Sequence, residues 1–245
     1  MKISIITATY NSAQNLSRCI DSVYQQTYPN KEYIIIDGKS TDNTLEIINK
    51  NKNKISDWIT EKDNGIYEAI NKGIKLATGD VIGLLHSDDV FADATVLTKV
   101  AEGLSDYNID CIYGDLKYVT NSGKTIRMWK SGPGTDAKIL DGWMPPHPTL
   151  FVRKEVFEKY GLYRTDMKIA ADYEMVLRLF YKNRIITHYL PFTTYLMTIG
   201  GTSNKSFKNI INKSKEDYRS MKMHKIPFPL YTLITKNFRK LTQFF

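Results

Sequence analysis

Apolar and polar positions follow a repeating strand-and-helix pattern over the first third of the chain. Between short apolar runs, apolar residues recur at helical spacing, first at Leu16, Cys19, Ile20 and Val23. The runs themselves are typical of buried strands and occupy residues 3–8, 33–36, 55–60 and 81–86. Strands that alternate with helices predict an α/β fold with a mostly parallel central sheet, covered by helices on both faces.

The second half of the chain is less regular. Residues 110–130 predict a hairpin, because alternating apolar residues flank an Asn-Ser-Gly turn. A Pro-Pro turn, a strand and a helix follow, and then an amphipathic helix over 168–183 and a further strand. Since no repeat or low-complexity linker separates these pieces, we expect one domain over residues 1–204.

Charge divides the chain in the same place. Residues 1–204 contain 24 Lys and Arg and 24 Asp and Glu, whereas residues 205–245 contain 10 and 2. A neutral body argues against a nucleic-acid groove, and a basic tail favours attachment to an anionic surface. We therefore expect no nucleic-acid partner.

The tail predicts two helices, and the second places apolar residues at helical spacing. These residues are Leu230, Leu233, Ile234, Phe238 and Leu241. A basic amphipathic segment can lie in a membrane interface. A helix docked on its own domain, or in an oligomer, explains the same pattern equally well.

Targeting signals are not evident. The chain has no stretch of 18 or more apolar residues, and its N-terminus does not resemble a secretory signal. We therefore expect a cytoplasmic protein. Its two cysteines, Cys19 and Cys111, lack the spacing of a metal site.

Polar clusters follow three of the predicted strands directly. They are the pair Tyr10 and Asn11, then Asp37, then the pair Asp88 and Asp89. In open α/β sheets, ligands bind outside the carboxyl ends of the strands. The three clusters are therefore expected to meet at one edge of the sheet.

The adjacent carboxylates of Asp88 and Asp89 repel each other unless a cation, hydrogen bonds or water compensates. A solvated turn explains a bare Asp-Asp pair. At the ligand edge of a sheet, however, Mg²⁺ or Mn²⁺ bound to one or two carboxylates and to a diphosphate is the alternative.

The other polar residues each have a functional and a structural interpretation. Asp37 could bind the sugar or base of a nucleotide, or equally form an Asx-turn or a helix cap. Tyr10 offers a ring for stacking on a base, or packs in a turn. Asp172 at the start of a helix suits the helix dipole whatever its function. His147, held between two prolines, is typical of a structural histidine.

Taken together, the motifs carry a resemblance to a known family. The segments "TATYN", "IIIDGKSTDNT", "GDVIGLLHSDD", "HPTLFVRKEVFEKYGLY", "IAADYEMVLRL" and "GGTSN" occur in order. This order resembles the family 2 glycosyltransferases, which are inverting, nucleotide-sugar-dependent enzymes with a GT-A fold. The resemblance covers roughly residues 1–204 and is greatest to bacterial members that build surface polysaccharides. It implies a Rossmann-like nucleotide-binding half, an acceptor-binding half and a C-terminal helical tail.

The resemblance also implies roles for individual residues. Asp172 matches the general base, and Asp88 and Asp89 match the end of the motif that holds Mn²⁺ or Mg²⁺. His86 stands where many relatives have an acid, so which carboxylate binds the metal stays open. His86 and His147 fall in the region of the acceptor or the donor sugar. The implied nucleotide-binding residues are Thr7, Thr9, Tyr10, Asn11, Asp37, Ser87 and Asp88.

The implied reaction moves a sugar, a hexose or N-acetylhexosamine, from a nucleotide-sugar, expected to be a UDP-sugar, to a hydroxyl of a lipid-linked or growing polysaccharide. The tail would then contact the inner face of the plasma membrane. Two alternatives stay open: a non-catalytic nucleotide-binding scaffold and a sugar nucleotidyltransferase. The second would need a Gly-rich basic loop where this chain has "TATYNSAQN". The motifs of P-loop enzymes and Rossmann dehydrogenases are missing from the sequence.

Overall fold

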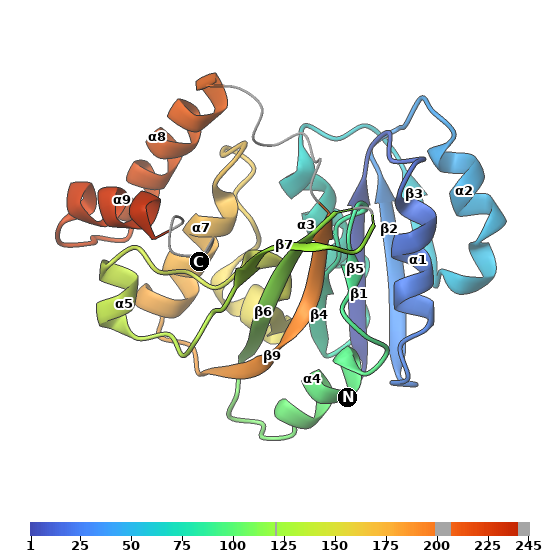
Figure 1. The fold of residues 1–245 in the computed structure, drawn as a ribbon, viewed down its shortest axis with the longest axis horizontal. Coiled ribbons are helices and arrows are strands. Elements are labelled where there is room, and N and C mark those ends of the chain that lie inside the picture. Colours follow the sequence, from blue (N-terminus) through green and yellow to red (C-terminus); the bar gives the residue numbers. More distant parts are fainter. Residues whose placement is uncertain (121, 199–206, 240–245) are drawn as a thin grey trace.

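The computed structural model describes residues 1–120, 122–198 and 207–239, and its strands form one sheet. The order across the sheet is β3-β2-β1-β4-β8-β6-β9-β5, and β7 pairs with β6 (Figure 1). The strands are β1 (Ile3–Thr9), β2 (Lys31–Asp37), β3 (Asp57–Thr60), β4 (Val81–Leu84), β5 (Val90–Phe91), β6 (Cys111–Val119), β7 (Thr125–Trp129), β8 (Phe151–Arg153) and β9 (Thr187–Thr198).

Helices cover both faces of this sheet (Figure 1). The α-helices are α1 (Leu16–Tyr24), α2 (Thr44–Lys50), α3 (Ile66–Leu76), α4 (Val96–Gly103), α5 (Asp136–Leu140), α6 (Lys154–Tyr160), α7 (Ala171–Val176), α8 (Phe207–Met223) and α9 (Pro229–Phe238). Two 3₁₀ turns, η1 (Lys52–Lys54) and η2 (His147–Thr149), and one π-helical turn, η3 (Leu177–Lys182), complete the described elements.

The direction of the strands changes half-way across the sheet. Strands β3, β2, β1 and β4 pair in parallel, as the alternation of strands and helices predicted. Strand β8 pairs antiparallel with both β4 and β6, and β7 and β5 are also antiparallel to their partners. Strands β6 and β9 pair in parallel, so the second half is mixed. Strands β6 and β7 form the predicted hairpin and are antiparallel because a short turn joins them.

The apolar runs are continuous because both faces of the parallel strands are buried. Side chains of successive residues point to opposite faces. On β2, Ile34 and Ile36 pack in a core with α3 and α7, whereas Tyr33 and Ile35 pack in a second core with α1 and α4. The sheet therefore separates two hydrophobic cores.

The tail docks on the body of the protein. Helices α8 and α9 lie beside α7 and α5 on one side of the molecule, opposite α1 and α2 (Figure 1). Met221 and Ile226 are buried in the same core as α3 and α7. The backbone of Lys236 packs closely on Gly142. A Cβ added at Gly142 would lie 2.5 Å from the backbone nitrogen of Lys236.

Both predicted tail helices are thus present. Their inner face packs on the body of the protein, as expected for a helix docked on its own domain. The division at residues 204 and 205 falls outside the described residues and stays a prediction. Within the described parts of the chain, no helix is both long and apolar enough to cross a membrane. The pattern did not predict α4, α5 or the two-residue strand β5.

Candidate active site

The parallel ladder aligns the ends of β1, β2 and β4. Its register places Thr9 beside Asp37 and Ile6 beside Leu84. The ladder continues one residue further on each side, because the N–H of Gly38 bonds the Thr9 carbonyl (2.9 Å) and that of Leu85 bonds the Ile6 carbonyl (3.0 Å). The loops that begin at Tyr10, Gly38 and His86 therefore leave the sheet at one edge, as predicted.

Tyr10 presents an exposed ring at this edge. Its side chain is 62% exposed, although it directly follows a buried strand. The ring lies over Gly38, where an added Cβ would be 3.4 Å from the Tyr10 Cδ2. An exposed aromatic face beside a residue without a side chain leaves room for a flat group to stack.

Asp37 and Asn11 shape the neighbouring loop. The buried Asp37 carboxylate accepts hydrogen bonds from the Ser40 backbone (3.0 Å) and from the hydroxyls of Ser40 and Thr60 (2.6 Å for Thr60). Asn11 has a φ of 49° and accepts a bond from the Thr41 backbone (2.9 Å). Both residues therefore hold the loop in place. For Asp37, this is the structural role of a turn-forming residue that the sequence offered as an alternative to nucleotide binding.

The structure does not bring Thr7 to the edge. Thr7 is fully buried, and its hydroxyl donates to the Leu85 carbonyl (2.7 Å) and contacts the Tyr33 hydroxyl (3.0 Å). It lies two residues before the strand ends, so its polar group bonds to neighbouring elements and not to solvent. Thr9 is also buried, but its hydroxyl has no hydrogen-bond partner among the described residues.

The two aspartates after β4 have different environments. Asp88 is partly exposed and accepts a bond from the Asn15 amide (3.2 Å). Asp89 is 3% exposed and accepts a bond from the Thr198 backbone (3.0 Å), which ties the end of β9 to this edge. Asp88 is thus the carboxylate that faces outward. The preceding Ser87 is buried, and its hydroxyl lies 2.9 Å from that of Ser12 in the β1 loop.

This carboxylate pair fits a divalent cation. Burial raises the pKa of Asp89 to about 7, and the neighbouring Asp88 adds to the rise, while Arg18 and the Thr198 N–H oppose it. A cation bound at Asp88 would offset the repulsion between the two neighbouring carboxylates. No cluster of three or more metal-binding side chains occurs in residues 1–120, 122–198 and 207–239. One or two carboxylates are what Mg²⁺ or Mn²⁺ takes when phosphate oxygens complete its coordination.

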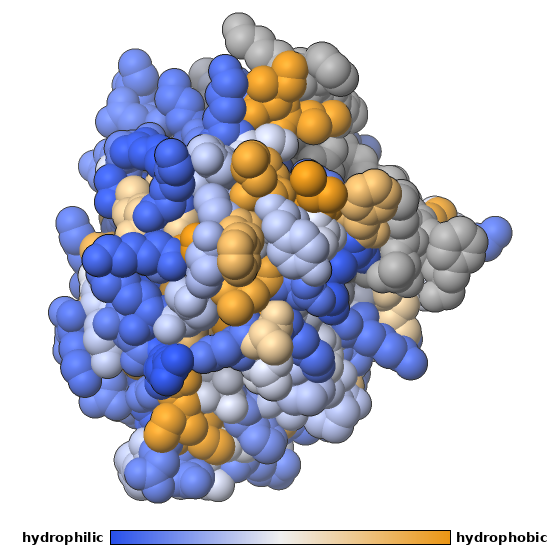
Figure 2. Space-filling view, turned by 90° about the vertical axis from the view of Figure 1, so that its left-hand side faces the viewer, coloured by the Kyte–Doolittle hydropathy of each residue, from blue (hydrophilic) through white to orange (hydrophobic). Residues whose placement is uncertain are grey.

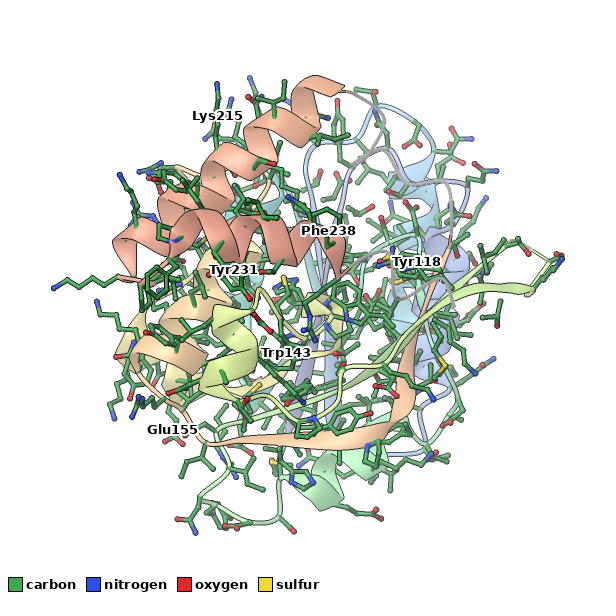
Figure 3. The ribbon with its side chains drawn as sticks, turned by 60° about the vertical axis from the view of Figure 1, so that its left-hand side comes forward. Tyr118, Trp143, Glu155, Lys215, Tyr231 and Phe238 are labelled. Atoms are coloured by element: carbon green, nitrogen blue, oxygen red, sulfur yellow. The ribbon has the colours of Figure 1, made fainter. Side chains whose placement is uncertain are left out.

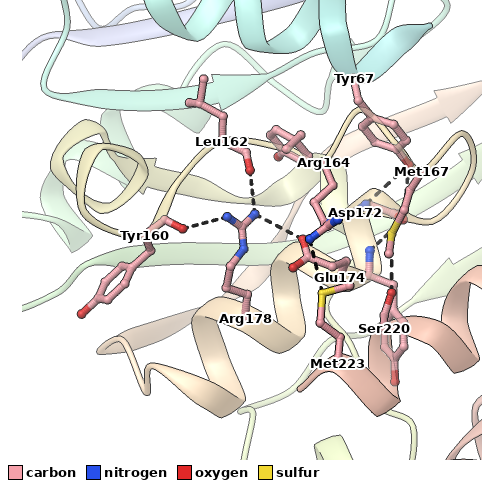
Figure 4. A network of polar contacts seen from close by, with 12 residues as sticks. Tyr67, Tyr160, Leu162, Arg164, Met167, Asp172, Glu174, Arg178, Ser220 and Met223 are labelled. Carbon is pink, nitrogen blue, oxygen red and sulfur yellow. Dashed lines mark hydrogen bonds and ion pairs between the residues drawn. The ribbon is translucent and has the colours of Figure 1, made fainter. Parts of the chain in front are cut away.

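Asp172 reaches the site from the second half of the chain. It is the second residue of α7, is partly exposed, and its Oδ1 accepts bonds from the Tyr173 backbone (2.8 Å) and the Tyr67 hydroxyl (3.4 Å) (Figure 4). The single proton of that hydroxyl is shared with the Ile169 carbonyl, which lies closer (2.9 Å). Tyr67 from α3 therefore links the entry of α7 to the nucleotide-binding half.

Two histidines, His86 and His147, are within the electrostatic influence of Asp172. Burial lowers the pKa of His86 to about 4; nearby His147 adds to the decrease and Asp172 opposes it. Burial also lowers the pKa of His147, whose Nε2 lies 2.7 Å from the Tyr163 hydroxyl. Both imidazoles are thus neutral at pH 7, and the shared influence of Asp172 places all three side chains in one region.

Three contact residues were not evident in the sequence: Tyr67, Asn15 and Glu216. Tyr67 lies 105 residues from Asp172, and Asn15 lies 73 from Asp88. No local pattern signals such contacts. Asn15 stands at the N-cap position of α1, yet its side chain makes no capping hydrogen bond and its amide donates to Asp88 instead. The "GGTSN" motif falls outside the described residues.

Comparison with known proteins identifies the family. A family model described as "Glycosyl transferase family 2" matches residues 4–161. The chain belongs to glycosyl transferase family 2. The match spans β1 to α6, with the loops that follow β1, β2 and β4, and ends before Asp172. This glycosyltransferase is 30% identical to a PGL/p-HBAD biosynthesis glycosyltransferase of Mycobacterium bovis over 206 residues, which cover 82% of this chain and 78% of that protein.

Further similarities extend to a larger enzyme and to solved structures. Chondroitin synthase of Pasteurella multocida is 29% identical over 218 residues, covering 88% of this chain and 22% of that protein. TarS of S. aureus has a TM-score of 0.70 at 22% identity, covering 91% of this chain and 39% of TarS. The mannosyltransferase PcManGT of Pyrobaculum calidifontis, solved with GDP-Man and Mn²⁺, has a TM-score of 0.67 at 16% identity, covering 96% and 68%. The predicted GT-A fold is confirmed.

The neutral state of His147 predicts how stability depends on pH. Below its ordinary pKa of about 6.5, the unfolded chain binds a proton at His147 that the native protein does not. Stability is therefore lost as pH falls from 7 to 5, with a contribution of up to about 1.4 kcal/mol per pH unit from this residue. His147→Asn should flatten the decline, measured as the free energy of urea unfolding at pH 7, 6 and 5. An unchanged slope would show that His147 is protonated in the native state.

Proposed function

We propose that this glycosyltransferase moves a sugar from a UDP-sugar to a hydroxyl of a glycan acceptor, with inversion at the anomeric carbon. The supporting observation is that Asp172 contacts Tyr67 of α3 and acts on the pKa of His86, which lies in the same loop as Asp88. The first half of the chain supplies the aligned strand ends, and α7 in the second half supplies the Asp172 carboxylate.

In this mechanism Asp172 takes the proton of the acceptor hydroxyl. The acceptor oxygen attacks the anomeric carbon from the face opposite the diphosphate, and the bond from that carbon to UDP breaks. The Oδ1 of Asp172 is occupied by Tyr67 and by its own helix, so we assign the proton to Oδ2. A single base and no covalent intermediate produce inversion.

The leaving group is UDP, and its charge must be stabilised. Asp88, supported by Asp89, would hold Mn²⁺ or Mg²⁺, and such an ion stabilises negative charge on a departing diphosphate. Tyr10 would stack on uracil beside Gly38. Thr9 and Ser87 would line the diphosphate path, whereas Asp37 and Asn11 would act through the loop that they hold. Neutral His86 and His147 would bind hydroxyls of the donor sugar or acceptor.

The printed names of several relatives support the proposed donor and acceptor classes. TarS structures with UDP and with UDP-GlcNAc support a uridine donor, and hence a hexose or N-acetylhexosamine. Relatives named for PGL/p-HBAD biosynthesis and for chondroitin synthesis support a lipid-linked or growing polysaccharide as acceptor. We therefore place the protein in the cytoplasm, in bacterial cell-surface glycan synthesis.

The tail supports contact with the inner face of an anionic membrane. Residues Leu230, Ile234 and Phe238 form one stripe along α9 and are each more than half exposed. Figure 2 looks onto this side, where apolar groups gather among hydrophilic ones, and Figure 3 shows Phe238 on α9 and Lys215 on the neighbouring α8. An apolar stripe with a basic surround suits a lipid interface.

Asp172→Asn tests the base directly. The substitution keeps the size and the hydrogen bonds of the side chain but removes its basicity, so turnover should fall ~10²- to 10⁴-fold. Turnover is measured as UDP release from a panel of UDP-hexoses and UDP-N-acetylhexosamines with alkyl glycosides as acceptors. The affinity for UDP with Mn²⁺ should stay within about twofold. Wild-type turnover in this variant would exclude Asp172 as the base.

Asp88→Asn tests the metal. We expect Mn²⁺ to increase the affinity for UDP in the wild type, as measured by titration calorimetry. The increase that Mn²⁺ produces should be at least ~10-fold smaller in Asp88→Asn. The matched control is Asp80→Asn, a carboxylate before β4 at the opposite end of the strand. Equal Mn²⁺ dependence in wild type and Asp88→Asn would exclude this metal site.

The membrane contact is tested with vesicles. Wild-type protein should sediment with phosphatidylglycerol-containing vesicles and less with pure phosphatidylcholine. Replacing Leu230, Ile234 and Phe238 together by Ser should reduce sedimentation ~10-fold or more. Ile186→Ser, an exposed apolar residue away from the tail, is the control. Equal binding by the triple variant and wild type would assign this stripe to another partner.

A further inference from the structure

One face of α8 contacts the segment that carries Asp172. Glu216, Ser220 and Met223 recur at helical spacing. The Ser220 hydroxyl contacts the Met167 sulfur (3.7 Å), and Met223 accepts a bond from Arg164 (3.5 Å) (Figure 4). The face therefore follows the loop before α7 over two helical turns.

Glu216 makes the closest contacts of this face. Its carboxylate accepts three backbone hydrogen bonds, from Lys168 (3.0 Å), Ile169 (2.9 Å) and Ala170 (2.8 Å). These residues immediately precede α7, whose second residue is Asp172. Consecutive N–H groups that converge on one carboxylate fix the backbone from which the helix starts.

A second contact from the tail reaches the residue next to Asp172. Lys236 of α9 is 4% exposed and pairs with Asp217 (2.6 Å), which is 3% exposed at its side chain. The Lys236 ammonium also lies 3.2 Å from the centre of the Tyr173 ring. Lys236 thus joins α8, α9 and the first turn of α7.

A third contact anchors the next turn. His224 lies 2.8 Å from Glu174. Glu174 also pairs with Arg178 (3.3 Å), as Figure 4 shows. The three contacts fall on both sides of Asp172 in the sequence. By comparison, the bond from Tyr67 to the Asp172 carboxylate is longer, at 3.4 Å.

We propose that the tail is part of the catalytic unit, and that Glu216 is the residue that positions Asp172. The inference rests on the proposed role of Asp172 as the base. A base must lie within hydrogen-bond reach of the acceptor hydroxyl, and a shift of about 1 Å can lower the rate ~10²-fold. Helix α7 has six residues and starts from a loop, so its entry needs an external anchor.

The test uses the full-length protein and Glu216→Gln, which keeps the size of the side chain. Gln offers one acceptor oxygen, whereas the three N–H groups use both carboxylate oxygens of Glu216. We expect kcat to fall ~10- to 100-fold, while KM for the UDP-sugar and the affinity for UDP with Mn²⁺ stay within about twofold. Glu158→Gln, an exposed glutamate on α6, is the matched control and should behave as wild type.

A combined variant separates positioning from general stability. If Glu216 acts through Asp172, adding Glu216→Gln to Asp172→Asn should change the residual rate less than about twofold. Hydrogen exchange at residues 168–172 should accelerate in Glu216→Gln at temperatures well below unfolding. If Glu216→Gln itself unfolds, Glu216→Asp, which keeps the charge but shortens the reach, replaces it in the same assays.

The outcomes distinguish the two claims. If Asp172→Asn retains wild-type turnover, the proposed base is wrong. If Asp172→Asn is inactive but Glu216→Gln keeps wild-type kcat, the base stands and the positioning role is refuted. Equal fractional losses from Glu216→Gln in the wild-type and Asp172→Asn backgrounds would also refute it, because the effect would then not pass through Asp172.

Discussion

The parallel pairing of β1 with β2 and β4 is the constraint on which the site depends. Its register sets Thr9 beside Asp37 and Ile6 beside Leu84, so the three following loops start at one edge. Burial on both faces fixes this register, because a slip of one residue would exchange the side chains of the two cores. The donor edge therefore follows directly from the packing of the sheet.

The base depends on a different kind of contact. Asp172 enters on a short helix whose position is set by Tyr67 from α3 and by the docked tail. Two halves thus meet at the site: a donor edge formed by neighbouring strand-and-helix units, and a carboxylate held by distant elements. The outer face of α9 carries the exposed side chains of Leu230, Ile234 and Phe238, while Lys236 and Asp217 form a buried ion pair between α9 and α8. The same helix pair that packs on the body of the protein therefore also supports the base.

The sequence predicted the parts that depend on local periodicity and on strand ends. The strands of the parallel half, the hairpin, the tail helices and the common edge of Tyr10 and Asp88 agree with the structure. It could not decide between the two roles of Asp37, because that depends on Thr60, 23 residues away. It did not reveal Glu216, whose three bonds span 46 to 48 residues, since nothing in a basic helix marks one glutamate as bonded to a distant loop.

The most direct test of the central claim, that this edge binds a nucleoside diphosphate through a metal, is a thermal-shift measurement on the purified wild-type protein. UDP, GDP, CMP and TDP are each added with and without Mn²⁺. We expect a stabilising shift with UDP that requires Mn²⁺ and exceeds the shift with the other nucleotides. The absence of a Mn²⁺-dependent shift with every nucleotide would refute the metal-dependent nucleotide site, and a shift with GDP alone would refute the proposed uridine donor.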